Sequence, residues 1–483
     1  MMILLATFLK YYRHNNYTKK HLMTNGDIMK KSMILIFTLI LTTVSFSQTD
    51  LTIEKAIQIA LQKNSALVKA KYNLESSKAS VKSAYGQLLP NFGIRGGWSW
   101  SKIEDIGGSQ LDYLGNPIVI PATSTDTRNY SVSAGGSVTL FDGLANYANI
   151  SSAENNYDAA KLNIDKYKKD IVQLTTIYYY TILKSEALLK VKEENFKYNN
   201  KLLETITERN KLGSAPIADL YAQQVQTGSA EVEMIRAQNS VDAAKNILIN
   251  YLALDVLSDY NFVSKIDVIN DNNIDSFSED FNEITTMVDI ALKNRTDYLG
   301  QLKLVMSAKE GITIAQGGFW PSLSGSYSLS TNSLEVGKLF DRKTWGVSLN
   351  LSIPIFSNFS TETSVQFAKV KELSVKEDLL ALERQIKIDI KQGYLDFQAV
   401  SKALEVSTKT VISAGENRRV QYERYSLGSG TFLDVLQSDR DYQNALSLRI
   451  EAEFNFHSVR QALLNSIGKL NYKQYENKSE NNN

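Results

Sequence analysis

The sequence predicts a mainly α-helical protein with membrane-spanning β-strands, built as two similar halves. Three observations lead to this prediction: an export signal near the N-terminus, an internal repeat that covers almost all of the remaining chain, and the alternation of very long helical segments with short strands of period 2. Together they describe an exported chain whose helices connect strands that a membrane can hold.

Residues 29–47 have the features of a secretory signal peptide. The basic pair Lys30 and Lys31 precedes an apolar run at 33–41, and small residues follow it. This run is shorter than the about 20 apolar residues that span a bilayer. Residues 1–28 are predicted to be a misplaced start. Without its signal the chain has 47 Lys and Arg against 51 Asp and Glu, and this balance argues against nucleic acid as a partner.

Composition argues against an enzyme. The chain has no cysteine and 3 histidines, and His457 is the only histidine beyond the signal peptide. Cysteine-ligated and histidine-rich metal sites are therefore excluded within one chain, and a Ser/His/Asp triad would need His457. No glycine-rich phosphate loop is present either, so we expect no cofactor, no metal and no catalysis. His457 is expected to pack or hydrogen-bond on its helix, and Asp439 and Asp441 are expected on a solvated helix face.

The mature chain contains two similar halves. Residues 60–90 recur at 291–321 with an offset of 231, and residues 141–250 recur at 356–465 with an offset of 215. The two offsets differ by 16 residues, which indicates one insertion, in the loop of residues 104–128. The predicted units are a first repeat (48–254: helix, strands 92–103 and 129–141, long helix, turn near 213, helix), a linker (255–284), a second repeat (285–468: helix, strands 322–330 and 344–354, long helix, turn near 428, helix) and a polar tail (469–483). The linker and the tail are expected to be irregular.

A long helix is predicted in each half. Leu144 to Leu212 contains no Pro and no Gly, and apolar residues recur there every three or four positions, as in a heptad seam. Such a helix is about 100 Å long at 1.5 Å per residue. The matching helix covers about 359–426. A plain coiled-coil stalk has the same pattern, so the helices alone leave that alternative open.

The strands favour a membrane protein. Each alternates an apolar or aromatic face with a small polar face, as when Trp98 and Trp100 alternate with Ser99 and Ser101. Their predicted length matches that of tilted membrane strands, about 9–11 residues, and the polar face suits a water-filled lumen. A soluble β-sandwich is the alternative, but it rarely has such long helices beside its strands. Since known barrels need about eight strands, the chain is expected to assemble with copies of itself.

The arrangement resembles the TolC-like outer-membrane efflux proteins, the outer-membrane factors of tripartite efflux and type I secretion systems. The resemblance covers residues 51–470 and rests on the opening segment 51–64, on Leu88, Leu89 and Pro90 before a strand, and on two turns, Leu212-Gly213-Ser214 with Asp219 and Leu427-Gly428-Ser429 with Asp434. It implies a homotrimer whose 12 pooled strands form one outer-membrane β-barrel in contact with lipid, continued by an α-barrel tunnel of helices through the periplasm of a Gram-negative bacterium. The linker would belong to an equatorial collar around the helices.

The resemblance also implies a function. Family members are exit ducts that work with a periplasmic adaptor (membrane fusion) protein and an inner-membrane pump of RND or ABC type. Tripartite efflux of small molecules is the favoured function, and a duct for type I protein secretion is the alternative. A secreted coiled-coil structural or adhesive protein is the rival from a different class.

The turns give the candidate site. Relatives narrow the periplasmic mouth with a Tyr, an Arg and two Asp; Tyr425 and Asp434 match, whereas Gly430 and Gln437 stand at the Arg and second Asp positions. The expected constriction comprises Tyr425, Asp434 and Asp219, and Arg424 or Asp439 is expected to compensate for the missing Arg and Asp. The expected adaptor-docking tips are Gly213, Ser214, Gly428 and Ser429. A separate aromatic girdle at the membrane is expected from Trp98, Trp100, Tyr327 and Trp345. Rings of carboxylates at a constriction bind cations and set charge selectivity. The alternative for Asp219 and Asp434 is helix capping.

Overall fold

A computed structural model describes residues 49–263 and 283–480, so the predicted signal peptide and misplaced start lie outside the described residues. The chain divides into two compact units. In the smaller unit, β1 (Thr49–Leu51) pairs in parallel with β6 (Tyr260–Phe262). The side-chain amide of Asn261 donates to Asp50 Oδ1 at 2.8 Å across this pair.

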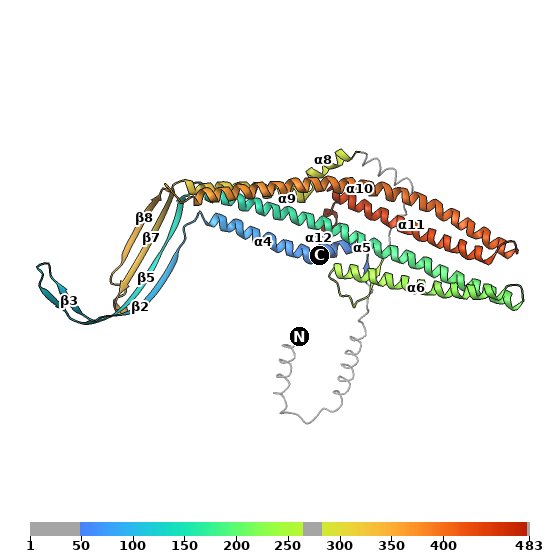
Figure 1. Cartoon of the computed structure of the whole chain (residues 1–483), viewed down its shortest axis with the longest axis horizontal. Coiled ribbons are helices and arrows are strands. Elements are labelled where there is room, and N and C mark those ends of the chain that lie inside the picture. The colour runs from blue at the N-terminus through green and yellow to red at the C-terminus, as the bar shows by residue number, and fades with distance from the viewer. Residues whose placement is uncertain (1–48, 264–282, 481–483) are drawn as a thin grey trace, which may run out of the picture. The chain divides into compact units, whose positions relative to one another are not determined.

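The larger unit contains the long helices (Figure 1). In the described part of this unit the helical elements are α3 (Ile53–Lys63), α4 (Ser65–Gly86), α5 (Ala145–Lys211), α6 (Ile217–Tyr251), α8 (Ile284–Asn294), α9 (Thr296–Gln316), α10 (Ser360–Ser426), α11 (Phe432–Ser466), α12 (Lys473–Glu480) and two 3-10 turns, Gly317–Phe319 and Val336–Lys338. α5 and α10 each have 67 residues, and α6 and α11 each have 35. The two halves thus carry helices of equal length after their strands.

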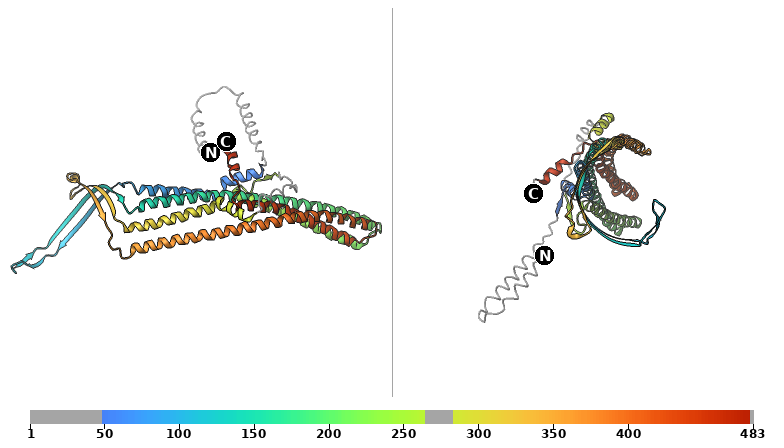
Figure 2. Two further views of the ribbon diagram at one scale, coloured as in Figure 1. Left: turned by 90° about the horizontal axis from the view of Figure 1, so that it is seen from above. Right: turned by 90° about the vertical axis from the view of Figure 1, so that its left-hand side faces the viewer.

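The helices of the larger unit form a curved layer, as the end-on view shows (Figure 2). In the part near the strands, α4, α5, α9 and α10 lie side by side in that order. In the other part, α6 packs on α5, α5 packs on α11, and α11 packs on α10. Each of the two long helices therefore belongs to both parts, which makes the layer continuous from the strands to the distal turns.

The long helices are held together by buried side chains at helical spacing. In α5 the buried positions Ile164, Ile171, Tyr179 and Ile182 follow one another at intervals of seven, eight and three residues, so they stay on one face. α8, α10 and α11 share an apolar cluster that includes Met287, Ile386, Phe397, Phe456 and Leu463. Near the distal turns, α5 and α11 share a second cluster of Leu202, Ile206, Phe432 and Val435. Packing along these seams is the main source of stability for helices of this length.

The four long strands form one antiparallel sheet in the order β2-β5-β7-β8. They are β2 (Gly93–Asp105), β5 (Thr123–Phe141), β7 (Ser322–Ser333) and β8 (Thr344–Ser352). The register places Ile94 opposite Ala134, Ala134 opposite Leu329, and Leu329 opposite Trp345. The predicted apolar faces of all four strands therefore coincide on one side of the sheet, and the Ser-rich faces coincide on the other. β2 and β8 are its two edges.

Three expectations about irregular segments were wrong. The loop predicted at 104–128 contains a further hairpin, β3 (Gly108–Leu111) paired with β4 (Pro117–Ile120), and β5 begins within it, at Thr123. The polar tail contains helix α12, and the linker contains β6. These segments escaped prediction because Ser and Thr obscure the alternation at the start of β5, and because β6 and α12 are too short to show a period. Within the described residues, no helix carries an apolar stretch long enough to cross a membrane.

Candidate functional site

The two distal turns have the same geometry. Gly213 and Gly428 have φ of +73° and +74°, the left-handed conformation that ends a helix. Ser214 N donates to Arg209 O at 2.8 Å, and Ser429 N donates to Arg424 O at 2.9 Å. Both serine hydroxyls donate to the same carbonyls as their own backbone amides. The four predicted tip residues thus form two matched helix C-caps, and an added Cβ on either glycine would meet nothing within 4 Å.

Tyr425 joins the two turns. Its hydroxyl donates to Asp219 Oδ2 at 3.2 Å, which links the end of α10 to the start of α6. The Tyr425 ring also packs against Phe432, and the Arg209 guanidinium lies 5.8 Å from the ring centroid. Burial and the neighbouring carboxylate raise the pKa of Tyr425, so the phenol stays a donor over the physiological range. The structure therefore brings together two of the predicted site residues, 206 positions apart.

Asp434 has the geometry of a helix cap. Its carboxylate accepts from the Thr431 hydroxyl at 2.8 Å and from Thr431 N at 3.1 Å, while Asp434 N donates to Thr431 Oγ1. This is a complete capping box at the start of α11. These hydrogen bonds lower the pKa of Asp434. Arg424 stays at its own turn, where it donates to Gln421 and to Ser429 O. Within the described residues it forms no ion pair with Asp434.

Asp439 corrects the expectation of a solvated face. It is 2% exposed, and Arg418 Nε lies 2.8 Å from its Oδ1. Burial raises the pKa of Asp439, and the Arg418 charge opposes that shift. Asp441 is exposed, as expected, and accepts from Gln437. The helical pattern failed for Asp439 because a helix in this layer has neighbours on more than one side, so its polar positions do not all reach water.

Arg418 and Asp439 belong to a buried polar seam that the sequence analysis missed. The Arg418 guanidinium lies 3.9 Å from the ring centroid of Tyr198 on α5 and 5.0 Å from that of Tyr442 on α11. Beside it, Gln223 on α6 donates to Asn199 O and Oδ1 on α5, at 3.0 Å each. The seam thus joins both helical hairpins. Its signal in the sequence is a set of buried polar pairs four residues apart, Asn195 with Asn199, Gln223 with Thr227 and Asp439 with Gln443.

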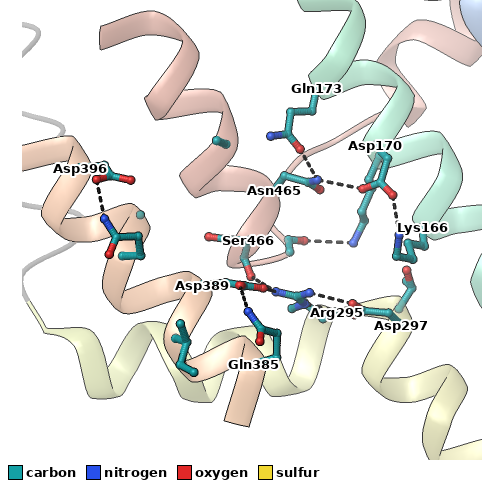
Figure 3. Close-up of a pocket in the computed structure, with 17 residues that line it drawn as sticks. Lys166, Asp170, Gln173, Arg295, Asp297, Gln385, Asp389, Asp396, Asn465 and Ser466 are labelled. Atoms are coloured by element: carbon teal, nitrogen blue, oxygen red, sulfur yellow. Dashed lines mark hydrogen bonds and ion pairs between the residues drawn. The ribbon is translucent and has the colours of Figure 1, made fainter. Parts of the chain in front are cut away.

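A polar cavity of about 560 Å³ lies where helix ends meet (Figure 3). Its charged side chains come from α5, α10 and the α8–α9 junction, and they largely pair with one another. Arg295 binds Asp297 at 2.7 Å and approaches Asp389 at 3.4 Å. Lys166 binds Asp170, also at 2.7 Å. Because these charges are satisfied internally, the cavity has the character of a structural joint.

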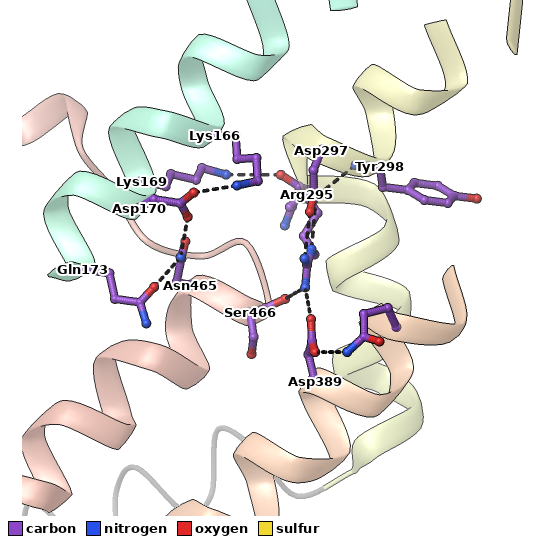
Figure 4. A network of polar contacts seen from close by, with 12 residues as sticks. Lys166, Lys169, Asp170, Gln173, Arg295, Asp297, Tyr298, Asp389, Asn465 and Ser466 are labelled. Carbon is purple, nitrogen blue, oxygen red and sulfur yellow. Dashed lines mark hydrogen bonds and ion pairs between the residues drawn. The ribbon is translucent and has the colours of Figure 1, made fainter. Parts of the chain in front are cut away.

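The same joint ties down two helix C-termini (Figure 4). Lys169 Nζ donates to Asn294 O at the end of α8 and to Gly468 O just after α11. Arg295 Nη1 donates to Ser466 O at 3.3 Å. Cations at helix C-termini complement the negative end of the helix dipole. We call Lys169, Arg295 and these three carbonyl groups the helix-end clasp.

The predicted aromatic residues lie on the apolar face of the sheet at different heights. Trp98 is opposite Tyr130, Trp345 is opposite Leu329, and Tyr327 is opposite Gly136. Trp98, Trp100 and Trp345 are more than half exposed, whereas the Tyr327 hydroxyl donates to Asn91 O at 2.7 Å where the chain enters β2. A Cβ at position 136 would lie 1.8 Å from that carbonyl oxygen, so only glycine fits beside Tyr327.

His457 lies among aromatic rings. Its ring centroid is 5.2 Å from that of Tyr180 and 6.0 Å from that of Phe456. Burial lowers its pKa, and its Nε2 has no hydrogen-bond partner within residues 49–263 and 283–480. In the described part of the chain, no three His, Asp or Glu residues gather closely enough to hold a metal ion.

Comparison with known proteins gives one consistent result. The family model described as "Outer membrane efflux protein" matches residues 56–254 and 287–469. Outer membrane protein TolC of Escherichia coli K12 is 20% identical over 92% of this chain and 87% of its own length. The toluene efflux pump outer membrane protein TtgC of Pseudomonas putida is 21% identical over 82% of this chain and 78% of its own.

The fold is also found in a solved structure. The CmeC outer membrane channel of Campylobacter jejuni superimposes with a TM-score of 0.74 at 15% identity, over 88% of both chains. The family match covers most of the chain, in two segments that each contain strands, a long helix and a distal turn. The chain therefore belongs to the outer membrane efflux protein family, as a protein of the Gram-negative outer membrane.

Proposed function

We propose that three copies of this chain form an exit duct for tripartite efflux, with no catalytic role of its own. Each copy would contribute four strands to a closed 12-stranded barrel in the outer membrane and two internally repeated sets of helices to a periplasmic tunnel. A periplasmic adaptor and an inner-membrane pump of RND or ABC type would complete the assembly. We also propose that the mature chain has the units predicted from its sequence: a first repeat at 48–254, a linker at 255–284, a second repeat at 285–468 and a tail at 469–483.

The observation that carries this proposal is the sheet with two unpaired edges. β2 and β8 each pair on one side only among the described strands, and one face of the sheet exposes apolar and aromatic side chains such as Trp98, Trp345 and Leu349. Open edges cannot remain in hydrocarbon, because each unpaired N–H or C=O costs several kcal/mol there. Pairing of β8 with β2 of another copy removes both edges at once. The curved layer of helices continues each strand pair, which supports a tunnel in line with the barrel.

Small molecules are the favoured cargo. The relative TtgC is named a toluene efflux pump outer membrane protein, and the face of the sheet that would line the lumen carries serine and other small side chains, such as Ser326 opposite Ser348. A type I protein-secretion duct has the same architecture. Cargo is chosen by the pump, so deletion of each candidate pump gene, followed by drug-susceptibility and secretion assays, distinguishes the two functions.

We further propose that the distal turns form the periplasmic gate. The Tyr425 to Asp219 hydrogen bond would hold the α10–α11 hairpin against the α5–α6 hairpin, and Gly213, Ser214, Gly428 and Ser429 would meet the adaptor. Asp434 would add a threefold carboxylate ring while it caps α11. Carboxylates arranged in this way favour cations over anions.

The experiment combines native mass measurement in detergent with single-channel conductance in planar bilayers. We expect a trimer with a small, cation-preferring conductance. Tyr425→Phe removes a hydrogen bond worth about 0.5–1.5 kcal/mol, so it is expected to raise the open fraction by about twofold to tenfold. Tyr422→Phe, on the same helix, is the matched control. Asp434→Ala is expected to weaken the cation preference.

The outcomes separate the two parts of the proposal. A trimer that conducts equally in Tyr425→Phe, Tyr422→Phe and wild type leaves the duct in place and removes the gate. A monomer without conductance contradicts the duct and favours the secreted coiled-coil alternative.

A further inference from the structure

The hairpin beyond the sheet exposes apolar side chains on both faces. We call residues 106–120, which include β3 and β4, the outer arm; it follows β2 at the end of the sheet away from the helices. Tyr113 is 99% exposed, Ile106 93% and Val119 78%. Because β4 is apolar at consecutive positions, neither of its faces is polar. Apolar patches of this kind are typical of surfaces that another molecule covers.

The outer arm has a built conformation. Gly107 has φ of +71°, and a Cβ there would lie 2.6 Å from Ile120 O, so the ribbon bends at a position that only glycine fits. Asp105 Oδ1 accepts from Gly107 N at 3.0 Å. At the tip, Asp112 Oδ1 accepts from Leu114 N and Asn116 N, at 2.9 and 2.8 Å. The arm therefore holds its apolar groups outward through defined contacts.

A complementary surface exists in the second half of the chain. We call residues 334–343, between β7 and β8, the outer loop. It ends in Arg342 and Lys343 and exposes Val336 and Phe340, at 61% and 62%. By contrast, the segment 104–126 carries four acidic residues and no Lys or Arg. One surface is thus acidic and apolar, and the other is apolar with a basic end.

Strand topology places these two surfaces at the same junction between neighbouring copies of the chain. α4 precedes β2 and α10 follows β8, so the end of β2 and the start of β8 both lie at the sheet end away from the helices. β2 and β8 run in opposite directions, as the order β2-β5-β7-β8 with antiparallel neighbours requires. When β8 of one copy pairs with β2 of the next, Arg342 and Lys343 approach Asp105 of that copy, beside Glu104, which pairs with Lys102 of its own strand.

We propose that the outer arm of each copy packs on the outer loop of the neighbouring copy and closes the outer end of the seam between them. The partner is thus a second copy of this chain, and the inference rests on the trimeric barrel proposed above. Apolar contacts would supply the buried area. The acidic and basic ends would set which surfaces meet, since charge complementarity favours specificity and encounter rate.

The chain has no cysteine, so engineered pairs test this contact directly. We expect Ile106→Cys combined with Phe340→Cys to give covalent trimers on oxidation in outer-membrane vesicles, and neither single variant to do so. Ile106→Cys with Leu427→Cys is the matched control, because Leu427 is 83% exposed at the opposite end of α10. Adding Arg342→Glu and Lys343→Glu is expected to slow cross-linking about tenfold. Adding Lys201→Glu, an exposed lysine on α5, is expected to leave the rate unchanged.

The native mass of each variant in detergent separates the two levels of inference. A trimer that forms covalent trimers from the 106 and 340 pair, and does so more slowly after charge reversal, supports the contact. A trimer without cross-links overturns the contact and leaves the duct in place. Cross-linking at the wild-type rate after charge reversal overturns the electrostatic part. A monomer overturns the proposed function, and the arm contact with it.

Discussion

At the scale of single residues, burial decides chemistry more than sequence spacing does. Asp439 and Asp441 lie two positions apart on α11, yet one is 2% exposed and the other faces solvent. Asp439 Oδ1 lies 2.8 Å from Arg418 Nε, and among the described residues neither carboxylate oxygen accepts a well-aligned hydrogen bond. Its carboxylate is therefore only partly compensated. A buried, partly compensated charge makes the packing of this seam depend on pH.

The sign of that dependence follows from the raised pKa of Asp439. Because the packed state favours the protonated form, the contribution of Asp439 to stability is full below the ordinary aspartate pKa and falls as pH rises through its raised native value. We expect the thermal midpoint of wild type, relative to Asp439→Asn, to decrease as pH rises above the ordinary aspartate pKa of about 4. Tyr198 on α5, Arg418 on α10 and Tyr442 on α11 are the other titratable groups that face this site.

Asp434→Asn is the control of opposite sign. Its capping hydrogen bonds lower the pKa of Asp434, so its contribution is present above the ordinary aspartate pKa and is lost as pH falls through the native value. The midpoint of wild type relative to Asp434→Asn is therefore expected to decrease toward acid. Equal pH profiles for the two variants would contradict the assignment of either environment.

At the scale of elements, the distal turns depend on glycine for their backbone. Gly428 has φ of +74°, and a side chain there costs about 1–2 kcal/mol. Gly228, inside α6, has helical geometry and open space around it, so alanine there is expected to gain about 0.5–1 kcal/mol. We expect Gly428→Ala to lower the apparent unfolding midpoint and Gly228→Ala to raise it. Hydrogen exchange should increase at the α10–α11 turn only in Gly428→Ala.

Much of the element order could be predicted from the sequence, because long uninterrupted periods carry it. The stretch without Gly or Pro and with a heptad seam corresponds to α5, and the alternating Ser-rich segments correspond to the four long strands. Tyr425 and Asp219 were named as site residues, but their hydrogen bond depends on how two hairpins approach, which periodicity does not contain. The Arg418 seam was missed for the same reason, because it depends on contacts between segments far apart in the chain. The outer arm is a local hairpin, and it was missed because its strands of four residues are too short to show a period.

At the scale of the whole larger unit, the helix-end clasp ties the end of α11, where the α10–α11 hairpin finishes, to the end of α8. Lys169 on α5 and Arg295 before α9 bind carbonyls at the ends of α8 and α11. Gly468 has φ of +79°, and a Cβ added to it would lie 3.1 Å from Asn294, so glycine allows the chain to pass close to Asn294 as it leaves α11. The clasp thus connects both halves of the chain at the level where the helical layer changes its set of neighbours.

Arg295 is the residue whose loss should affect this joint most. Its side chain is 15% exposed, and its partner Asp297 is 16% exposed. The substitution Arg295→Met leaves the buried Asp297 carboxylate without its cation, and such a change in a buried ion pair costs about 3–5 kcal/mol of stability. We expect a clear fall in the apparent unfolding midpoint, with faster hydrogen exchange at the ends of α8 and α11. Arg384→Met is the matched control, because its ion pair with Glu377 is more than 60% exposed on both sides and such pairs contribute about 0–1 kcal/mol.

A second variant shows whether the charge or the packing is responsible. In Arg295→Met with Asp297→Leu the buried Asp297 carboxylate is removed together with its cation, and the more exposed Asp389 is the carboxylate left beside position 295, so part of the lost stability should return. The carbonyl at the end of α11 would still lack its donor, because Arg295 Nη1 binds Ser466 O. Exchange at that helix end should therefore stay fast while the midpoint recovers. If the midpoint and slow exchange both return, packing alone accounts for the stabilising effect of the clasp. If neither returns, the contacts to the carbonyl groups account for it.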